Sequence, residues 1–103
     1  MKEYEIYVPL YYNDETPVEV RKLQQLQKRL VDQFEGLTFL PQPNQGIWKM
    51  GGVTYRDEII IYRVQTAKIR AARQFLLRLK KDLEKDLKQE KILIVEKDIA
   101  YLE

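Results

Sequence analysis

Residues 53–64 of this chain are VTYRDEIIIYRV, the longest run of strand-forming residue types in the sequence. β-Branched and aromatic side chains favour the pleated surface of a sheet. The first half of the run alternates loosely around charged positions 56–58, whereas residues 59–64 are largely apolar on both faces. A strand with two apolar faces is typical of the middle of a sheet, so we predict that residues 53–64 form a central strand.

A helix is predicted before this strand, with a start signal at residues 16–19, TPVE. Thr16 is expected to be the N-cap, Pro17 suits the first helical position, and Glu19 completes a capping box. Gly36 is expected to end the helix. Apolar side chains at helical spacing form one face between these limits, at Val20, Leu23, Leu26, Leu30, Val31 and Phe34.

A second helix is predicted after the central strand, with Thr66 as its cap. Its apolar face follows the same three-four spacing, at Ile69, Ala72, Leu76, Leu79, Leu83 and Leu87. The stretch from residue 68 to residue 81 carries basic residues and no acidic one. This predicts a basic surface made by Arg70, Arg73, Lys80 and Lys81. The net charge of +2 is too small to indicate nucleic acid by itself. The alternatives are a solvated face, an acidic protein partner, or a weak contact with nucleic acid.

Three further strands complete the pattern, at residues 3–12, 37–40 and 92–95, and residues 41–52 are expected to form a long loop. In the first strand Tyr4, Ile6 and Val8 are expected to share one face. The resulting order is β-α-β-β-α-β. Two right-handed crossovers in one sheet predict an α+β fold of the ferredoxin-like plait type, with a four-stranded antiparallel sheet and two helices on one face.

The length of 103 residues predicts a single domain over 1–103, in which residues 96–103 form an extra strand or a partner-binding tail. The chain contains no cysteine and no histidine. This composition excludes disulfides, thiolate catalysis, Ser-His-Asp triads and metal sites ligated by Cys or His. We therefore expect no catalytic residue, metal or cofactor. The sequence contains no apolar run of about 18 residues and no signal-peptide pattern, which predicts a cytoplasmic protein without membrane association.

The face of the sheet that the helices do not cover is the first functional candidate. We expect Tyr7 and Tyr62 to lie on it together with other apolar side chains. Exposing several large apolar side chains to water is unfavourable, so this face is expected to form a homodimer interface. The alternatives are stacking of nucleic-acid bases and closure of a small-ligand pocket.

Trp48 and the run at residues 55–58 are the second candidate. Trp48 is the only tryptophan and is flanked by glycines, which is consistent with a binding loop or with a lid over the core. Strand alternation would place Tyr55 with Asp57 on one face and Arg56 with Glu58 on the other. Arg56 and Glu58 are consistent with a polar ligand site or with cross-strand charge pairing.

Four short motifs in this chain carry a resemblance to a known family. They are YY at 11–12, FEGLT at 34–38, GIW at 46–48 and RDE at 56–58. Together with the order of strands and helices, this pattern resembles a family of short bacterial proteins of unknown function.

The resemblance implies the same plait-like fold and no assigned activity. In that family the first strand tends to end in an aromatic-Gly pair, whereas residues 12–13 here are Tyr-Asn. The positions that match the family, and that we expect to contact a ligand or partner, are Tyr11, Trp48, Arg56 and Glu58.

The sequence leaves three functions open. The first is a small binding or assembly module, homodimeric through its open sheet face. The second is a small cofactor-free enzyme of the dimeric α/β-barrel kind, which requires a pocket between sheet and helices. The third is a weak nucleic-acid binder that uses the basic second helix.

Overall fold

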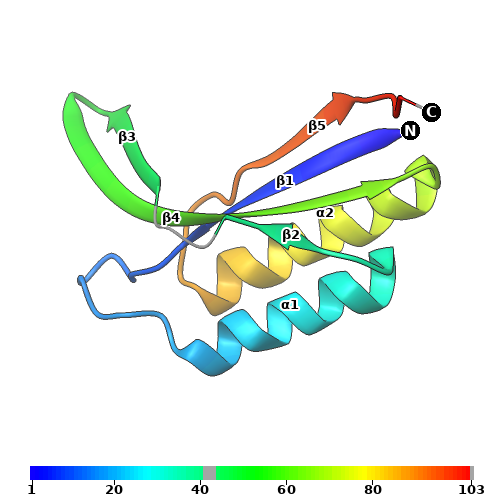
Figure 1. The fold of residues 1–103 in the computed structure, drawn as a ribbon. Coiled ribbons are helices and arrows are strands. Elements are labelled where there is room, and N and C mark those ends of the chain that lie inside the picture. The colour runs from blue at the N-terminus through cyan, green and yellow to red at the C-terminus, as the bar shows by residue number, and fades with distance from the viewer. Residues whose placement is uncertain (41–43, 103) are drawn as a thin grey trace.

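The fold is α+β, with two helices packed against an antiparallel sheet (Figure 1). It was obtained as a computed structural model that describes residues 1–40 and 44–102. The elements in chain order are β1 (Lys2–Pro9), α1 (Val20–Phe34), β2 (Thr38–Phe39), β3 (Asn44–Met50), β4 (Val53–Thr66), α2 (Ile69–Asp86) and β5 (Ile94–Asp98).

Four strands were predicted, but the sheet has five in the described part of the chain. The additional strand is β3, which residues 44–50 form where a loop was predicted. Residues 41–43 of that loop lie outside the described residues. The turn that joins β3 to β4 explains the extra strand. It consists of Gly51 and Gly52, whose φ angles of +56° and +79° are those that two-residue hairpin turns require.

The central position of β4 in the sheet is confirmed. The order is β2-β4-β1-β5, and β3 pairs with β4 off this path. Residues 59–66 of β4 pair with β1, whereas residues 53–59 pair with β3. In Figure 1 the β3–β4 hairpin extends past the ends of the helices and bends toward the side of the sheet that they leave free. We call residues 44–58 the arm.

The core lies between the sheet and the two helices. Tyr4, Ile6 and Val8 of β1 are buried on the side that faces the helices, as the alternation predicts. Leu26 and Leu30 of α1 are buried against them. From α2 and the segment after it come Ala72, Leu76, Leu79, Leu83 and Leu87, also buried. Val20 and Val31 were predicted on the apolar face of α1 but are exposed.

The predicted start of the first helix is wrong. Helix α1 begins at Val20 after Glu19, and the side chain of Thr16 does not cap it. The Thr16 hydroxyl donates to Asp14 Oδ1 at 2.5 Å, and the Thr16 carbonyl accepts from the Tyr12 N–H at 2.8 Å. Residues 16–18 therefore run back along the end of β1, which leaves Thr16 in a turn instead of a helix cap.

The predicted start of the second helix is also displaced. Thr66 is the last residue of β4, and α2 begins at Ile69 after Lys68. The Thr66 hydroxyl accepts from the Lys68 N–H at 3.0 Å, which is a local turn bond and not a helix cap.

The last strand covers Ile94–Asp98 instead of residues 92–95, so the start of the predicted tail belongs to β5. Residues 99–102 are not in a strand, and the Ile99 N–H donates to the Met1 carbonyl at 3.3 Å. Among the described residues, no helix combines the length and apolar character needed to cross a membrane.

Candidate functional site

The side of the sheet opposite the helices does not include Tyr62. Tyr62 pairs with Ile6 across β1 and β4, and both side chains are fully buried toward the helices. The Tyr62 hydroxyl accepts from Gln27 Nε2 of α1 at 3.1 Å. The prediction that Tyr62 belongs to an open-face interface is therefore wrong. The neighbouring pair Tyr7 and Ile61 occupies the open side, and both residues are partly exposed there.

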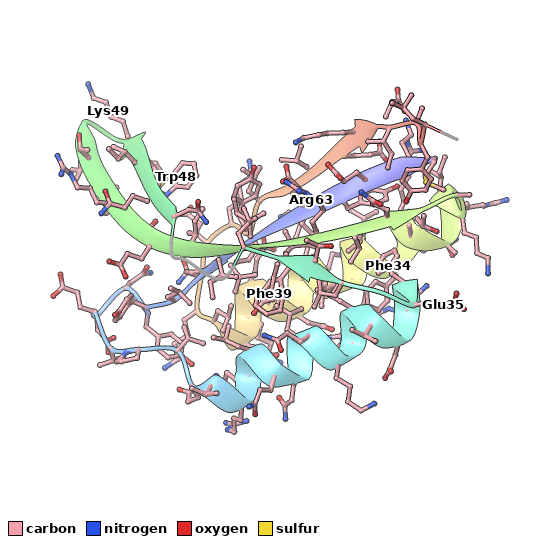
Figure 2. The ribbon with its side chains drawn as sticks, in the orientation of Figure 1. Phe34, Glu35, Phe39, Trp48, Lys49 and Arg63 are labelled. Carbon is pink, nitrogen blue, oxygen red and sulfur yellow. The ribbon has the colours of Figure 1, made fainter. Side chains whose placement is uncertain are left out.

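The middle of the open side is charged, where an apolar surface was expected. Glu5 is only 4 % exposed. Its carboxylate accepts from Arg63 Nη2 at 2.9 Å and lies 2.6 Å from Lys97 Nζ. A second carboxylate, that of Glu3, lies 3.6 Å from Arg63 Nε. The bonds from Lys97 and Arg63 lower the pKa of Glu5. Figure 2 shows Arg63 on this side of the sheet. The negative charges of the two glutamates balance the positive charges of Arg63 and Lys97, so these four residues form an ion network without net charge.

The arm carries Trp48, the tryptophan of the candidate site (Figure 2). Trp48 lies opposite Tyr55 in the hairpin, and its Nε1 donates to Asp57 Oδ2 at 2.7 Å. Its ring lies over Gly46, where a Cβ atom would be 2.7 Å from Trp48 Cζ2. Trp48 is 38 % exposed and belongs to a strand away from the helices. It is therefore neither a loop residue nor a lid over the core.

The structure does not bring the four family-matching residues together. Arg56 and Glu58 are exposed on β4, each one position away from the residues that share a face with Trp48. Strand alternation places them on the opposite face of the arm from Trp48 and Tyr55. Tyr11 is 44 % exposed and lies beyond the end of β1, where it forms a bridge with the segment at residue 17. Three of the four residues thus lie on the two faces of the hairpin, and Tyr11 lies outside it.

Large apolar side chains remain exposed along the arm. The exposed fractions are 61 % for Ile47, 38 % for Trp48, 54 % for Met50, 52 % for Val53 and 46 % for Tyr55. At the root of the arm, Ile59 is only 6 % exposed. The apolar surface therefore begins beyond Ile59 and extends to the hairpin turn.

The basic surface of α2 is partly neutralised inside the chain. Arg73 donates to Glu96 through Nε at 2.7 Å and through Nη2 at 2.9 Å, and Lys80 pairs with Glu84. Arg70 and Lys81 are exposed, and no carboxylate of the described residues pairs with either. An acidic partner for this surface stays a prediction. Two of its four positive charges, those of Arg73 and Lys80, already pair with carboxylates of this chain.

The Arg73 pair belongs to a larger network at the edge of the sheet. The Tyr4 hydroxyl donates to Glu96 at 2.8 Å. The bonds from Arg73 and Tyr4 lower the pKa of Glu96 to about 2. Burial, together with the bond to Glu96, raises the pKa of Tyr4 to about 12. Both groups keep their protonation states across the physiological range, which is consistent with a structural role.

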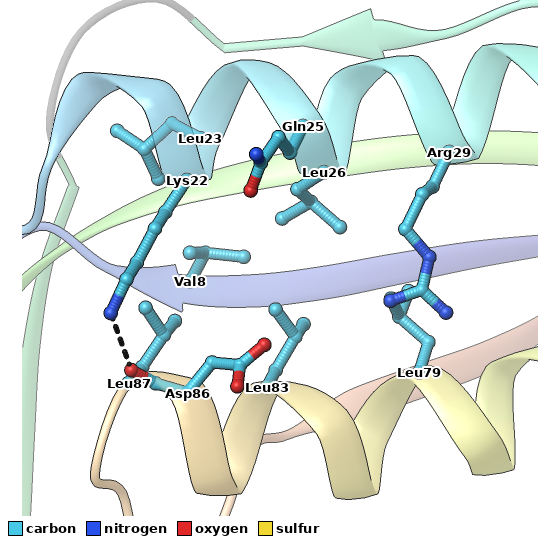
Figure 3. A pocket seen from close by; sticks show the side chains of 10 residues that line it. All are labelled: Val8, Lys22, Leu23, Gln25, Leu26, Arg29, Leu79, Leu83, Asp86 and Leu87. Atoms are coloured by element: carbon cyan, nitrogen blue, oxygen red, sulfur yellow. Dashed lines mark hydrogen bonds between the residues drawn. The ribbon is translucent and has the colours of Figure 1, made fainter.

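A groove between the two helices, over Val8 of β1, lies where the enzyme alternative requires a pocket (Figure 3). Val8 forms part of its apolar floor, and Lys22 crosses one end and donates to the Asp86 carbonyl at 2.9 Å. The volume is about 70 Å³. Ligand pockets are typically about 300–1,000 Å³, so this groove is too small for most substrates.

A second hollow of about 510 Å³ lies beside Tyr12, a residue that the sequence analysis did not select. The Tyr12 hydroxyl donates to Glu19, and the amino groups of Lys22 and Lys88 lie 5.4 and 5.7 Å from the ring centre. The hollow is lined by both charge signs, and each lysine already contacts the ring. Among the described residues there is no cluster of three side chains able to ligate a metal.

Comparisons with known proteins inform the fold but not the chemistry. No family model matches the chain, and no curated protein is significantly similar in sequence. A solved structure described as a phage SAM lyase in complex with S-methyl-5'-thioadenosine matches with a TM-score of 0.69. The match covers 94 % of this chain and 80 % of the lyase, at 14 % sequence identity. At this identity the likeness shows a shared fold alone, and membership of the bacterial family stays a prediction.

Proposed function

We propose that this protein is a small assembly module that associates with itself through the arm. The observation that carries the proposal is the exposure of large apolar side chains on a hairpin that no helix covers. A two-stranded hairpin is marginally stable in water. A partner that covers the arm would stabilise it.

The energetics support a contact of this kind. Burying one large apolar side chain contributes about 1.5–3 kcal/mol, and the arm residues are on average about half exposed. Each of these side chains that a partner covers would therefore contribute roughly 0.8–1.5 kcal/mol before the cost of association. The ion network around Glu5 is neutral, so it does not oppose the approach of a second copy. Because symmetric dimers are the commonest oligomers, a second copy is the partner that we propose.

The strand order also supports the ferredoxin-like interpretation. The order β2-β4-β1-β5, with both helices on one side, is the order that two right-handed β-α-β crossovers produce. We infer a plait of these four strands to which the β3 hairpin is added. Because of the added hairpin, we place the proposed interface on the arm instead of the centre of the open side, where the sequence predicted it.

The test is the solution mass of the protein, by light scattering over a concentration series. Wild-type protein is expected to form a dimer, and Ile47→Glu, on the arm, is expected to shift the transition to higher concentration. Leu77→Glu is the matched control, because Leu77 is 63 % exposed on α2, away from the arm. A wild-type protein that stays monomeric at millimolar concentration would rule out the proposal. So would equal effects of the two variants.

A second candidate is a cofactor-free enzyme that acts on a sulfonium nucleoside such as S-adenosylmethionine. The fold likeness to a SAM lyase favours it, and so does the pairing of Trp48 and Tyr55 beside Asp57. An adenine base can stack on an aromatic ring, and a sulfonium cation is attracted by aromatic faces and by carboxylates. In a cleavage that yields the thioadenosine, the bond from sulfur to the amino-acid chain breaks and its electron pair stays on sulfur. The amino-acid fragment then loses a proton or closes onto its own carboxylate.

The enzyme candidate is tested by incubating the protein with S-adenosylmethionine and measuring S-methyl-5'-thioadenosine by liquid chromatography. Asp57→Asn is expected to remove any activity while the fold is retained. The control is Glu90→Gln, since Glu90 is exposed and lies in the segment between α2 and β5. Product that forms no faster than without protein would exclude this candidate.

A further inference from the structure

The outer edge of β3 is the most open backbone edge of the sheet. Among the described residues β3 pairs only with β4, so one side of its backbone faces outward. Exposed edges are normally protected by charges, by proline or by short length. The other two edge strands follow this rule, since β2 is only two residues long and three of the five residues of β5 are charged. β3 is seven residues long and has one charged residue, Lys49.

The hairpin turn determines which backbone groups of β3 face outward. In a two-residue hairpin the two residues that flank the turn exchange backbone hydrogen bonds with each other. Along the two strands, such hydrogen-bonded pairs alternate with pairs whose backbone N–H and C=O groups point away from the partner strand. Met50 flanks the turn and pairs with Val53. The N–H and C=O groups of Met50 therefore point to β4, whereas those of Gln45, Ile47 and Lys49 point outward.

We infer that this edge pairs antiparallel with β3 of a second copy, around a two-fold axis at Ile47. The inference rests on the proposed self-association and specifies its geometry. Ile47 then lies opposite the partner's Ile47, and Gln45 lies opposite the partner's Lys49. The sheets of the two copies become one continuous sheet across the axis.

Two features select this register over its neighbours. An axis at Ile47 is the one that lets all three outward-facing residues form hydrogen-bonded pairs, whereas an axis one residue to either side leaves one of them without a pair. It places two exposed isoleucines in contact.

Charge supports the same register. An axis at Lys49 would set two lysines directly opposite each other, which is unfavourable. With the axis at Ile47, each Lys49 meets a neutral glutamine. The pairing uses backbone groups and Ile47, and it leaves the Glu5 network on β1 untouched.

The register is tested with single-cysteine variants, since the chain has no cysteine of its own. Ile47→Cys is expected to give a covalent dimer with a short bismaleimide crosslinker. Val53→Cys is the control, because Val53 is also about half exposed on the arm but lies on β4, away from the axis.

A proline variant separates the register from self-association itself. Ile47→Pro removes an outward N–H that β4 does not use, and proline is tolerated in edge strands. We expect it to raise the dimer dissociation constant about a hundredfold, from the loss of the two central hydrogen bonds. If Ile47→Pro still forms dimers and Ile47→Cys does not crosslink, the edge pairing is overturned while the proposed assembly stands. If the wild-type protein is a monomer, the edge pairing and the proposed assembly are both overturned.

Discussion

Replacing Glu5 with glutamine tests the ion network on the open side of the sheet. Glu5→Gln keeps the size of the side chain but removes its charge, and so weakens the bonds from Arg63 and Lys97. Hydrogen bonds to charged groups contribute about 1.5–3 kcal/mol each. The Arg63 and Lys97 side chains are 34 % and 49 % exposed, so water takes over part of their interaction. We therefore expect the free energy of unfolding to fall by about 2 kcal/mol at neutral pH. For a chain of this size this lowers Tm by about 10 °C.

The effect of Glu5→Gln should depend on pH in a defined direction. The pKa of Glu5 is lowered in the folded state below its ordinary value of 4.5. Its contribution to stability is therefore complete above the unfolded pKa and is lost as the pH falls through the folded pKa. Other carboxylates also titrate in this range, but they do so in wild type and variant alike. The difference between the two proteins therefore isolates Glu5.

The assay is urea unfolding followed by circular dichroism at 222 nm, at several pH values from 7 down to 2. The difference in unfolding free energy is expected to be largest at neutral pH and to approach zero at the acid end. Glu90→Gln serves as the control, because exposed Glu90 forms no ion pair with the described residues. Equal stability of wild type and Glu5→Gln at pH 7, or a difference that stays constant down to pH 2, would refute the reasoning.

Three other substitutions test the arm and the core. Gly46→Val is expected to displace the Trp48 ring, because a Cβ would lie 2.7 Å from Trp48 Cζ2; unchanged tryptophan emission would contradict this contact. Gly52→Ala is expected to destabilise the arm by about 1–2 kcal/mol, since φ at this position is +79°. Hydrogen exchange of the arm amides measures the loss, and equal protection would contradict it. Leu79→Ala is expected to lower the free energy of unfolding by about 2–5 kcal/mol, because Leu79 is fully buried. Leu77→Ala, at a 63 % exposed position, should change it by less than about 0.5 kcal/mol, and similar losses in urea unfolding would refute the assigned helix face.

The elements that sequence could predict are those whose signal repeats along the chain. The buried face of β1 follows from alternation, and most buried positions of α1 and α2 follow from helical spacing. The boundaries depended on single residues, and several were wrong. Thr16 has the side chain of a helix cap, but its backbone pairs with Tyr12, a contact that depends on how the chain folds back after β1. Local sequence does not contain that information.

The open side of the sheet shows a second limit. Alternation divides β4 into two sets of side chains but does not say which set faces the helices. Tyr62 and Arg63 are neighbours in sequence, and one of them is buried against α1 while the other joins Glu5 on the open side. The choice follows from the register between β1 and β4, which brings Glu5 opposite Arg63. Because this register is a long-range property, an apolar open face was expected where the structure has an ion network.

The arm combines local order with exposed apolar surface, and this combination favours assembly over catalysis. The two-glycine turn and the bond from Trp48 to Asp57 hold the hairpin together without a core of its own. The apolar groups left over, such as Ile47 and Val53, lie at the edge and near the turn, where a second chain can reach them. Catalysis at the same place would use the Asp57 carboxylate, which already accepts a bond from the only tryptophan. A substrate would have to displace that bond or share the carboxylate with it, whereas a second chain on the β3 edge would leave it intact.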